Sequence, residues 1–91
     1  MDIKEIRQYV VDNNETELMP HEIDHVADGL EHIYRWYHEG YPLGSFLTAV
    51  INNDLMESVF TADYINIKAL KIYAFFLTWK LPGDWREKAK C

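Results

Sequence analysis

The residues best suited to binding chemistry lie around two glycines and a proline, in residues 40–55. Gly44 and Ser45 lead directly into a predicted helix, whose start leaves free backbone N–H groups and a positive dipole end beside Ser45 and Thr48. Such a helix start can hold a phosphate group. An ordinary turn followed by a serine-capped helix explains the same residues, because most N-caps bind no ligand.

Polar and aromatic side chains flank this turn and helix. Asn53 and Asp54 follow the helix and offer amide and carboxylate groups that could read the edge of a nucleobase. Trp36 lies off the apolar stripe of the preceding helix, and with Tyr41 it could stack on a base or contact a partner. Packing against the protein core is the alternative for the aromatic residues near the turn.

The uneven distribution of charge suggests where an anion would bind. Residues 1–60 hold 12 acids and 3 bases, whereas residues 61–91 hold 3 acids and 6 bases. An anionic ligand should therefore contact the C-terminal third of the chain. Equally, the two oppositely charged parts could attract each other, within one chain or between subunits. The candidate cations are Lys68, Lys71, Lys80 and Arg86.

The segment from His21 to His25 matches H-E-x-x-H, in which two histidines bind zinc and the glutamate acts as a general base. Here the motif directly follows Pro20, in the first turn of a predicted helix. The extended form of the motif also fails, because Gly29 and His32 each come one residue late. We therefore predict no metal site, and the P-loop and dinucleotide-binding fingerprints are also missing. The sequence predicts a non-enzymatic protein without a cofactor.

Composition restricts the class of protein further. The chain has 91 residues, enough for one small domain, and a formal net charge of −6. This charge argues against binding to DNA, RNA or an anionic membrane, because proteins that bind these polyanions need an excess of Lys and Arg. With one cysteine, Cys91, no secretory signal and no membrane-spanning stretch, the chain is expected in the cytoplasm.

Helical spacing of apolar residues and local capping signals predict an all-α domain, a bundle of four to five helices. Residues 1–83 should form this single domain and residues 84–91 a frayed polar tail. The first predicted helix is capped by Asp2, with Glu5 in capping-box position, and the second runs from Pro20 to Gly40. A short helix over residues 46–52 is capped by Ser45, and another begins at Asp54. A long last helix is opened by Thr61 or Asp63, runs to Trp79 and is closed by Leu81-Pro82-Gly83.

Two features concern how these helices pack. Gly29 lies inside the second helix, where we expect a neighbouring backbone to approach closely. The last long helix carries a second apolar stripe of Leu70, Tyr73 and Leu77 beside its first. A chain this short should not bury both stripes, so we expect a symmetric homo-oligomer. Coverage of both stripes by the N-terminal helices is the alternative.

The central part of the sequence, from about His38 to Pro82, resembles a widespread family of small bacteriophage proteins. The resemblance does not extend to residues 1–20. It is carried by the pattern His38-x-Gly40-x-Pro42-x-Gly44-Ser45-Phe46-Leu47-x-Ala49-Val50-x-x-Asn53-Asp54-Leu55, followed by Ala62-Asp63-x-x-Asn66 and a proline after the last helix.

This family includes the tetrameric anti-CBASS sponges, which sequester the cyclic dinucleotide signals of bacterial antiviral immunity. The resemblance implies a homotetrameric, non-enzymatic binder of 3′3′-cyclic GMP–AMP and related nucleotides in the cytoplasm of the infected host. A cyclic dinucleotide has two phosphates, two bases and approximate two-fold symmetry. Placed on the motif, Lys68 and Lys71 would neutralise the phosphates, and Asn53, Asp54 and Asn66 would select the bases.

A second hypothesis starts from the acidic N-terminal part of the chain. Helically spaced acids, including Asp24, Asp28 and Glu31, could mimic nucleic acid or block a basic surface of a host protein. This alternative predicts a phage inhibitor that needs its acidic face and no small molecule.

Overall fold

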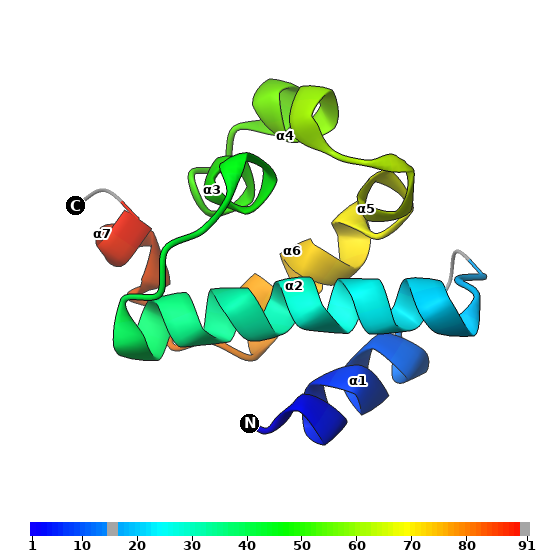
Figure 1. The fold of residues 1–91 in the computed structure, drawn as a ribbon. Helices are drawn as coiled ribbons and strands as arrows, with labels where there is room; N and C mark the ends of the chain where they lie inside the picture. The colour runs from blue at the N-terminus through cyan, green and yellow to red at the C-terminus, as the bar shows by residue number, and fades with distance from the viewer. Residues whose placement is uncertain (15–16, 90–91) are drawn as a thin grey trace.

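A computed structural model describes residues 1–14 and 17–89, and it confirms the all-α prediction. The long helix α2 runs across the molecule, with α1 on one side and the shorter helices α3 to α5 arching over the other (Figure 1). The helices in the described residues are α1 (Ile3–Asp12), α2 (Pro20–Glu39), α3 (Ser45–Ile51), α4 (Leu55–Thr61), α5 (Tyr64–Lys68), α6 (Leu70–Trp79) and α7 (Trp85–Ala89).

The capping signals correctly predict the first two helices. The Asp2 side chain accepts a hydrogen bond from the Glu5 backbone N–H at 2.9 Å, and the Glu5 carboxylate accepts one from the Asp2 N–H at 3.3 Å. Pro20 occupies the first turn of α2. Gly40 ends α2 in the left-handed conformation, with φ of 72°, a backbone geometry that glycine adopts without strain.

The start of α3 differs from the prediction. Ser45 is already the first helical residue, and the cap position belongs to Gly44, whose extended backbone supplies the carbonyl that accepts from the Thr48 N–H at 2.9 Å. No side chain caps α3. The next two starts agree with the sequence, because Asp54 caps α4 and Asp63, one of the two predicted residues, caps α5.

The long last helix of the prediction is divided in two. α5 ends at Lys68 and α6 begins at Leu70, with the fully buried Ala69 between them. Side chains on both sides of this break make contacts that hold it in place. Lys68 contacts Glu22 on α2, and the Tyr73 hydroxyl donates to the Asn66 Oδ1 at 2.8 Å. Trp79, predicted on the apolar stripe of the long helix, is instead 73 % exposed.

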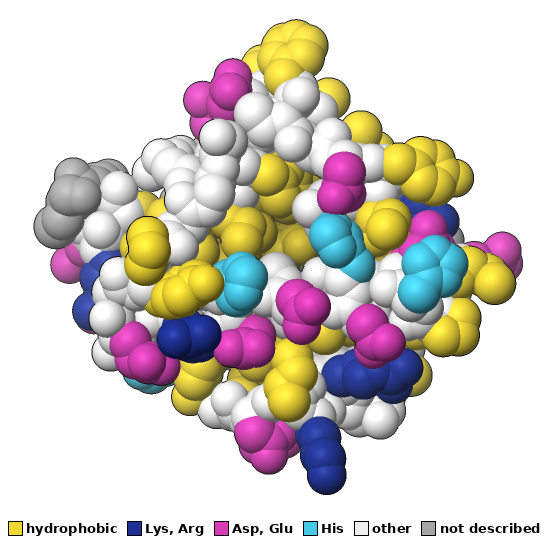
Figure 2. All heavy atoms as spheres, in the orientation of Figure 1, with side chains coloured by type: hydrophobic (Ala, Val, Ile, Leu, Met, Phe, Trp, Pro, Cys, Tyr) yellow, Lys and Arg dark blue, Asp and Glu magenta, His cyan; other side chains and the backbone are white. Residues whose placement is uncertain are grey.

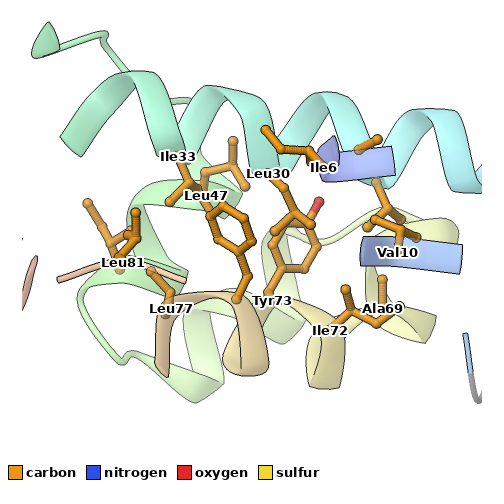
Figure 3. Close-up of a cluster of buried hydrophobic side chains, with 14 of the residues drawn as sticks. Ile6, Val10, Leu30, Ile33, Leu47, Ala69, Ile72, Tyr73, Leu77 and Leu81 are labelled. Carbon is orange, nitrogen blue, oxygen red and sulfur yellow. The ribbon is translucent and has the colours of Figure 1, made fainter. Parts of the chain in front are cut away.

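Most of both apolar stripes of α6 is covered within the chain, which is the alternative to the covering by a partner chain that we expected. Ile72, Tyr73, Phe76 and Leu77 are all buried, in one cluster that includes side chains from α1, α2, α3 and α7. Figure 3 shows the Tyr73 side chain rising from α6 toward α2. Side chains of the N-terminal helices, α3 and α7 provide this cover, whereas Leu70 is half-buried and Trp79 is exposed.

The C-terminal segment also differs from the prediction of a frayed tail. Residues Trp85–Ala89 form α7, and Trp85 is buried in the core cluster. The Tyr37 hydroxyl donates to the Asp84 carboxylate, and the Lys88 ammonium lies 4.7 Å from the centre of the Tyr37 ring. These contacts attach the segment to α2. Residues 90 and 91 of the expected tail lie outside the described residues.

A close approach at Gly29 occurs as predicted, but a side chain makes it. A Cβ atom at Gly29 would overlap the Tyr73 hydroxyl oxygen and would lie 3.2 and 3.3 Å from two ring carbons of Tyr73. The absence of a side chain at Gly29 therefore admits a buried tyrosine beneath α2. Among the described residues, none of the helices combines the length and apolar character that crossing a bilayer requires.

Candidate functional site

A pocket of about 260 Å³ lies between the α3–α4 turn and helices α6 and α7, and we call it the α4–α7 pocket. Two predicted site residues, Asn53 and Asp54, line it. Arg86, one of the four candidate cations, lines it as well. Its other polar lining residues are Ser58 and Thr78, and its apolar wall includes Leu55, Leu77 and Trp85.

Local backbone geometry places the two polar residues at the mouth of this pocket. Asn53 has a φ of 57°, and asparagine tolerates this left-handed conformation better than most residues. The turn at Asn53 directs the chain from α3 into α4, where the Asp54 Oδ1 accepts from the Glu57 N–H at 3.1 Å. The buried Ser58 hydroxyl donates to the Asp54 carbonyl at 2.7 Å. Hydrogen bonds therefore fix the backbone of this wall.

Arg86 and Trp85 form the opposite wall. The Arg86 guanidinium lies 5.2 Å from the centre of the Trp85 ring, within the range of a cation–π contact. Trp85 is buried, whereas Arg86 is exposed. A guanidinium held by an aromatic ring and facing a pocket can bind an anion such as a phosphate.

Asn66 lies away from this site, in a second pocket of about 280 Å³ between α2 and α5. His25, Asp28 and His32 of α2 border this α2–α5 pocket. In Figure 2, histidine and acidic side chains border a recessed hydrophobic area. The Asn66 Oδ1 already accepts from the Tyr73 hydroxyl, so this amide holds α5 to α6. The structure does not bring Asn66 together with Asn53 and Asp54.

The predicted phosphate site at the start of α3 is also separate. Neither pocket is lined by Gly44, Ser45 or Thr48. A seven-residue helix is about 10 Å long, so Ser45 and Asn53 lie at opposite ends of α3. The Thr48 hydroxyl donates to the Leu43 carbonyl at 3.4 Å, a contact inside the turn.

The predicted lysines and aromatic residues have contacts of their own. Lys68 donates to both carboxylate oxygens of Glu22, at 2.9 and 3.1 Å. The Lys71 ammonium lies 5.4 Å from the centre of the Phe75 ring. Trp36 is half-buried against the core. Tyr41 lies 5.1 Å from the His32 ring and 4.3 Å from the Arg35 guanidinium.

The Glu22–Lys68 pair gives the glutamate of the H-E-x-x-H segment a structural role. Glu22 is 5 % exposed, and its carboxylate accepts from the Met19 N–H at 2.8 Å as well as from Lys68. His25 is 2.8 Å from the Asp63 carboxylate. Among the described residues, no group of three or more His, Cys, Asp or Glu side chains could hold a metal ion. Glu22 caps α2 and joins it to α5.

Glu22 gives the protein a predictable response to acid. The backbone hydrogen bond from Met19, and then the hydrogen bond from Lys68, lower the pKa of the Glu22 carboxyl below its ordinary value of 4.5. Its charge therefore stabilises the fold above pH 4.5, and this contribution is lost as the pH falls through the lower folded-state pKa. We expect Glu22→Gln to lower Tm at neutral pH and the difference from wild type to shrink in acid.

Thermal unfolding followed by circular dichroism across this pH range measures the effect. Glu17→Gln, a change of the same type at an exposed glutamate, is the matched control and should leave Tm nearly unchanged. A Glu22→Gln deficit that stays constant into strong acid would show that the charge of Glu22 does not stabilise the fold.

The acidic surface of the second hypothesis is partly neutralised within the chain. Asp24 pairs with Arg7 at 2.6 Å, and Arg35 lies 3.7 Å from Glu31 and 3.9 Å from Glu39. A nucleic-acid mimic needs unpaired negative charge facing its target. Because of these ion pairs, the surface carries less unpaired negative charge than the number of acids suggests. The support for a nucleic-acid mimic is correspondingly weaker.

Sequence reasoning missed the contributions of Trp85, Ser58 and Thr78 to the pocket. Trp85 carried a signal: a tryptophan among charged residues, just after a proline–glycine turn, is more consistent with an anchored helix than with a frayed tail. Ser58 and Thr78 lie on separate helices, so only the tertiary fold brings them together. No family model, no curated protein and no solved structure matches this chain.

Proposed function

We propose that this protein binds and sequesters a cyclic dinucleotide such as 3′3′-cyclic GMP–AMP without hydrolysing it. The observation that carries the proposal is the α4–α7 pocket, where Asn53 and Asp54 lie across from Arg86 and Trp85. The motif that resembles the phage family contains the first two of these residues. In the setting that the resemblance implies, the protein acts in an infected bacterium against CBASS signalling.

The chemistry of the pocket matches the parts of a nucleotide. The Asn53 amide can both donate to and accept from a base edge. The Arg86 guanidinium suits a phosphate, which it can bind through two parallel hydrogen bonds. Leu55, Leu77 and Trp85 provide an apolar wall for a base or sugar. Binding through these groups requires no nucleophile or general base, which agrees with sequestration of an intact ligand.

The size of the pocket favours a ligand shared between chains. Pockets for drug-sized molecules usually measure about 300–1,000 Å³, and this one is about 260 Å³. It therefore accommodates one half of a cyclic dinucleotide. A two-fold symmetric ligand would be held between the pockets of two chains in a homo-oligomer, and a tetramer would hold two such ligands.

Replacing Arg86 by alanine should weaken binding of 3′3′-cyclic GMP–AMP by about 10- to 100-fold, since a hydrogen bond to a charged group contributes about 1.5–3 kcal/mol. Isothermal titration calorimetry measures the change. Lys4→Ala removes a positive charge from an exposed position on α1, outside the pocket, and is the matched control. Arg86→Ala binding equal to that of Lys4→Ala would exclude this pocket.

Ser45→Ala distinguishes the two ends of α3. With the ligand in the α4–α7 pocket, this variant should bind like wild type. A larger loss of affinity in Ser45→Ala than in Arg86→Ala would place the ligand at the start of α3 instead.

A further inference from the structure

Helices α4 and α5 carry the largest concentration of exposed apolar side chains in the described residues. On α4, Met56 is 65 % exposed and Phe60 is 74 % exposed; on α5, Tyr64 is 74 % exposed. Figure 2 shows hydrophobic side chains protruding at the top of the molecule, where Figure 1 places α4. The α4–α5 face consists of Leu55, Met56, Val59, Phe60, Tyr64 and Ile67.

This face lies on helices that have little support of their own. α4 has seven residues and packs mainly against α3, and Ser58 is its one buried residue. All four of its large apolar side chains are exposed. Helices shorter than about 12 residues are not stable in water without tertiary packing. A protein surface covering these side chains would supply that packing.

The area of the face matches what one chain contributes to a stable dimer. A large aromatic side chain such as Phe60 or Tyr64 has about 150–250 Å² of surface, and both are about three-quarters exposed. With the four aliphatic side chains, the face presents several hundred Å², comparable to the about 800 Å² that each partner buries in a standard interface. An exposed apolar surface of this size is typical of an interaction site.

The charges on the face favour a second copy of this chain. Residues 55–68 contain two acids, Glu57 and Asp63, and one base, Lys68; Asp63 is paired with His25 and Lys68 with Glu22. A helix that lies on a membrane is rich in basic residues on its polar side, and a nucleic-acid surface also requires them. An apolar face with little net charge can pack against its own copy across a two-fold axis, because the symmetry opposes no large like charges.

We propose that the α4–α5 face is the surface through which two copies of this chain dock symmetrically. Leu55 belongs both to this face and to the wall of the α4–α7 pocket. Docking there would bring the pockets of the two chains to the same interface. The inference rests on the proposed function for this role in ligand binding, whereas the docking itself needs no ligand.

The test is the molar mass of the ligand-free protein, measured by light scattering after size-exclusion chromatography. Wild type should elute as a dimer or a higher even oligomer. Phe60→Asp should reduce the mass at least twofold, because a buried, unpaired carboxylate is strongly unfavourable. Trp79→Asp is the matched control: Trp79 is 73 % exposed but lies at the far end of α6, about 15 Å from α5. It should keep the wild-type mass.

A cross-linking variant keeps the test decisive if Phe60→Asp does not fold. In a Cys91→Ser background, Tyr64→Cys should form a cross-linked dimer with a bifunctional thiol reagent, and Trp79→Cys should not. Equal cross-linking of both variants, a monomeric wild type, or an unchanged mass of folded Phe60→Asp would overturn the proposed interface. A wild-type protein that forms the oligomer but binds no cyclic dinucleotide would instead count against the proposed function alone.

Discussion

Phe76→Ala should lower the free energy of unfolding by about 3–5 kcal/mol, the cost of deleting a buried aromatic side chain and leaving a cavity. This is a large share of the about 5–15 kcal/mol that stabilises a typical domain. Phe76 is fully buried, and its ring packs edge-on against Tyr9 at 5.9 Å between centroids. Since α1 buries Ile6 and Val10 in the same cluster, the loss should extend to the docking of α1.

The adjacent residue provides the control for this substitution. Phe75 is half-buried on the same helix and lies outside the core cluster, so Phe75→Ala changes helix propensity equally but removes less buried area. Urea unfolding followed by circular dichroism measures both variants. Similar losses of stability in Phe75→Ala and Phe76→Ala would show that α6 is not buried on the face described.

Gly29→Ala should destabilise the protein, although alanine is the better helix former by about 1 kcal/mol. The new Cβ would overlap the hydroxyl of Tyr73, which is 1 % exposed and bonded to Asn66. Because the tyrosine ring is rigid and packed in the core, we expect the overlap to be relieved by a shift of the ring or of α2, at the about 1–3 kcal/mol typical of overpacking. We therefore expect a net loss of stability in urea unfolding.

Tyr73→Phe tests the cause of that loss. The single variant removes the hydrogen bond to Asn66 and should cost about 1 kcal/mol. In the double variant with Gly29→Ala, the hydroxyl that meets the new Cβ is gone, so the double variant should be more stable than the sum of the single effects predicts. Additive effects would mean that the Tyr73 hydroxyl does not limit the residue at position 29.

Local signals in the sequence are sufficient to locate most of the helices. Asp2, Pro20, Gly40 and Asp54 act through their own side chains or backbone on the adjacent turn, so their effects are visible in the sequence. The break at Ala69 has no such signal, because the apolar spacing continues through it without glycine or proline. It coincides with contacts to α2 and α6 that depend on tertiary structure.

The candidate site was less predictable, for a related reason. The charge distribution identified four cations but could not say which of them face a ligand. For Lys68, the alternative that the two parts of the chain attract each other is correct, because its partner is Glu22, 46 positions earlier in the sequence. Arg86 joins Asn53 and Asp54 because the buried Trp85 anchors α7 to the core, whereas the sequence favoured a frayed tail.

The most direct test of the proposed function is calorimetric titration of the wild-type protein with 3′3′-cyclic GMP–AMP, followed by heating and analysis of the released nucleotide. We expect saturable binding with one nucleotide for every two chains, and recovery of the nucleotide unchanged. No heat across a panel of cyclic dinucleotides would contradict the assignment, and so would recovery of a linear dinucleotide.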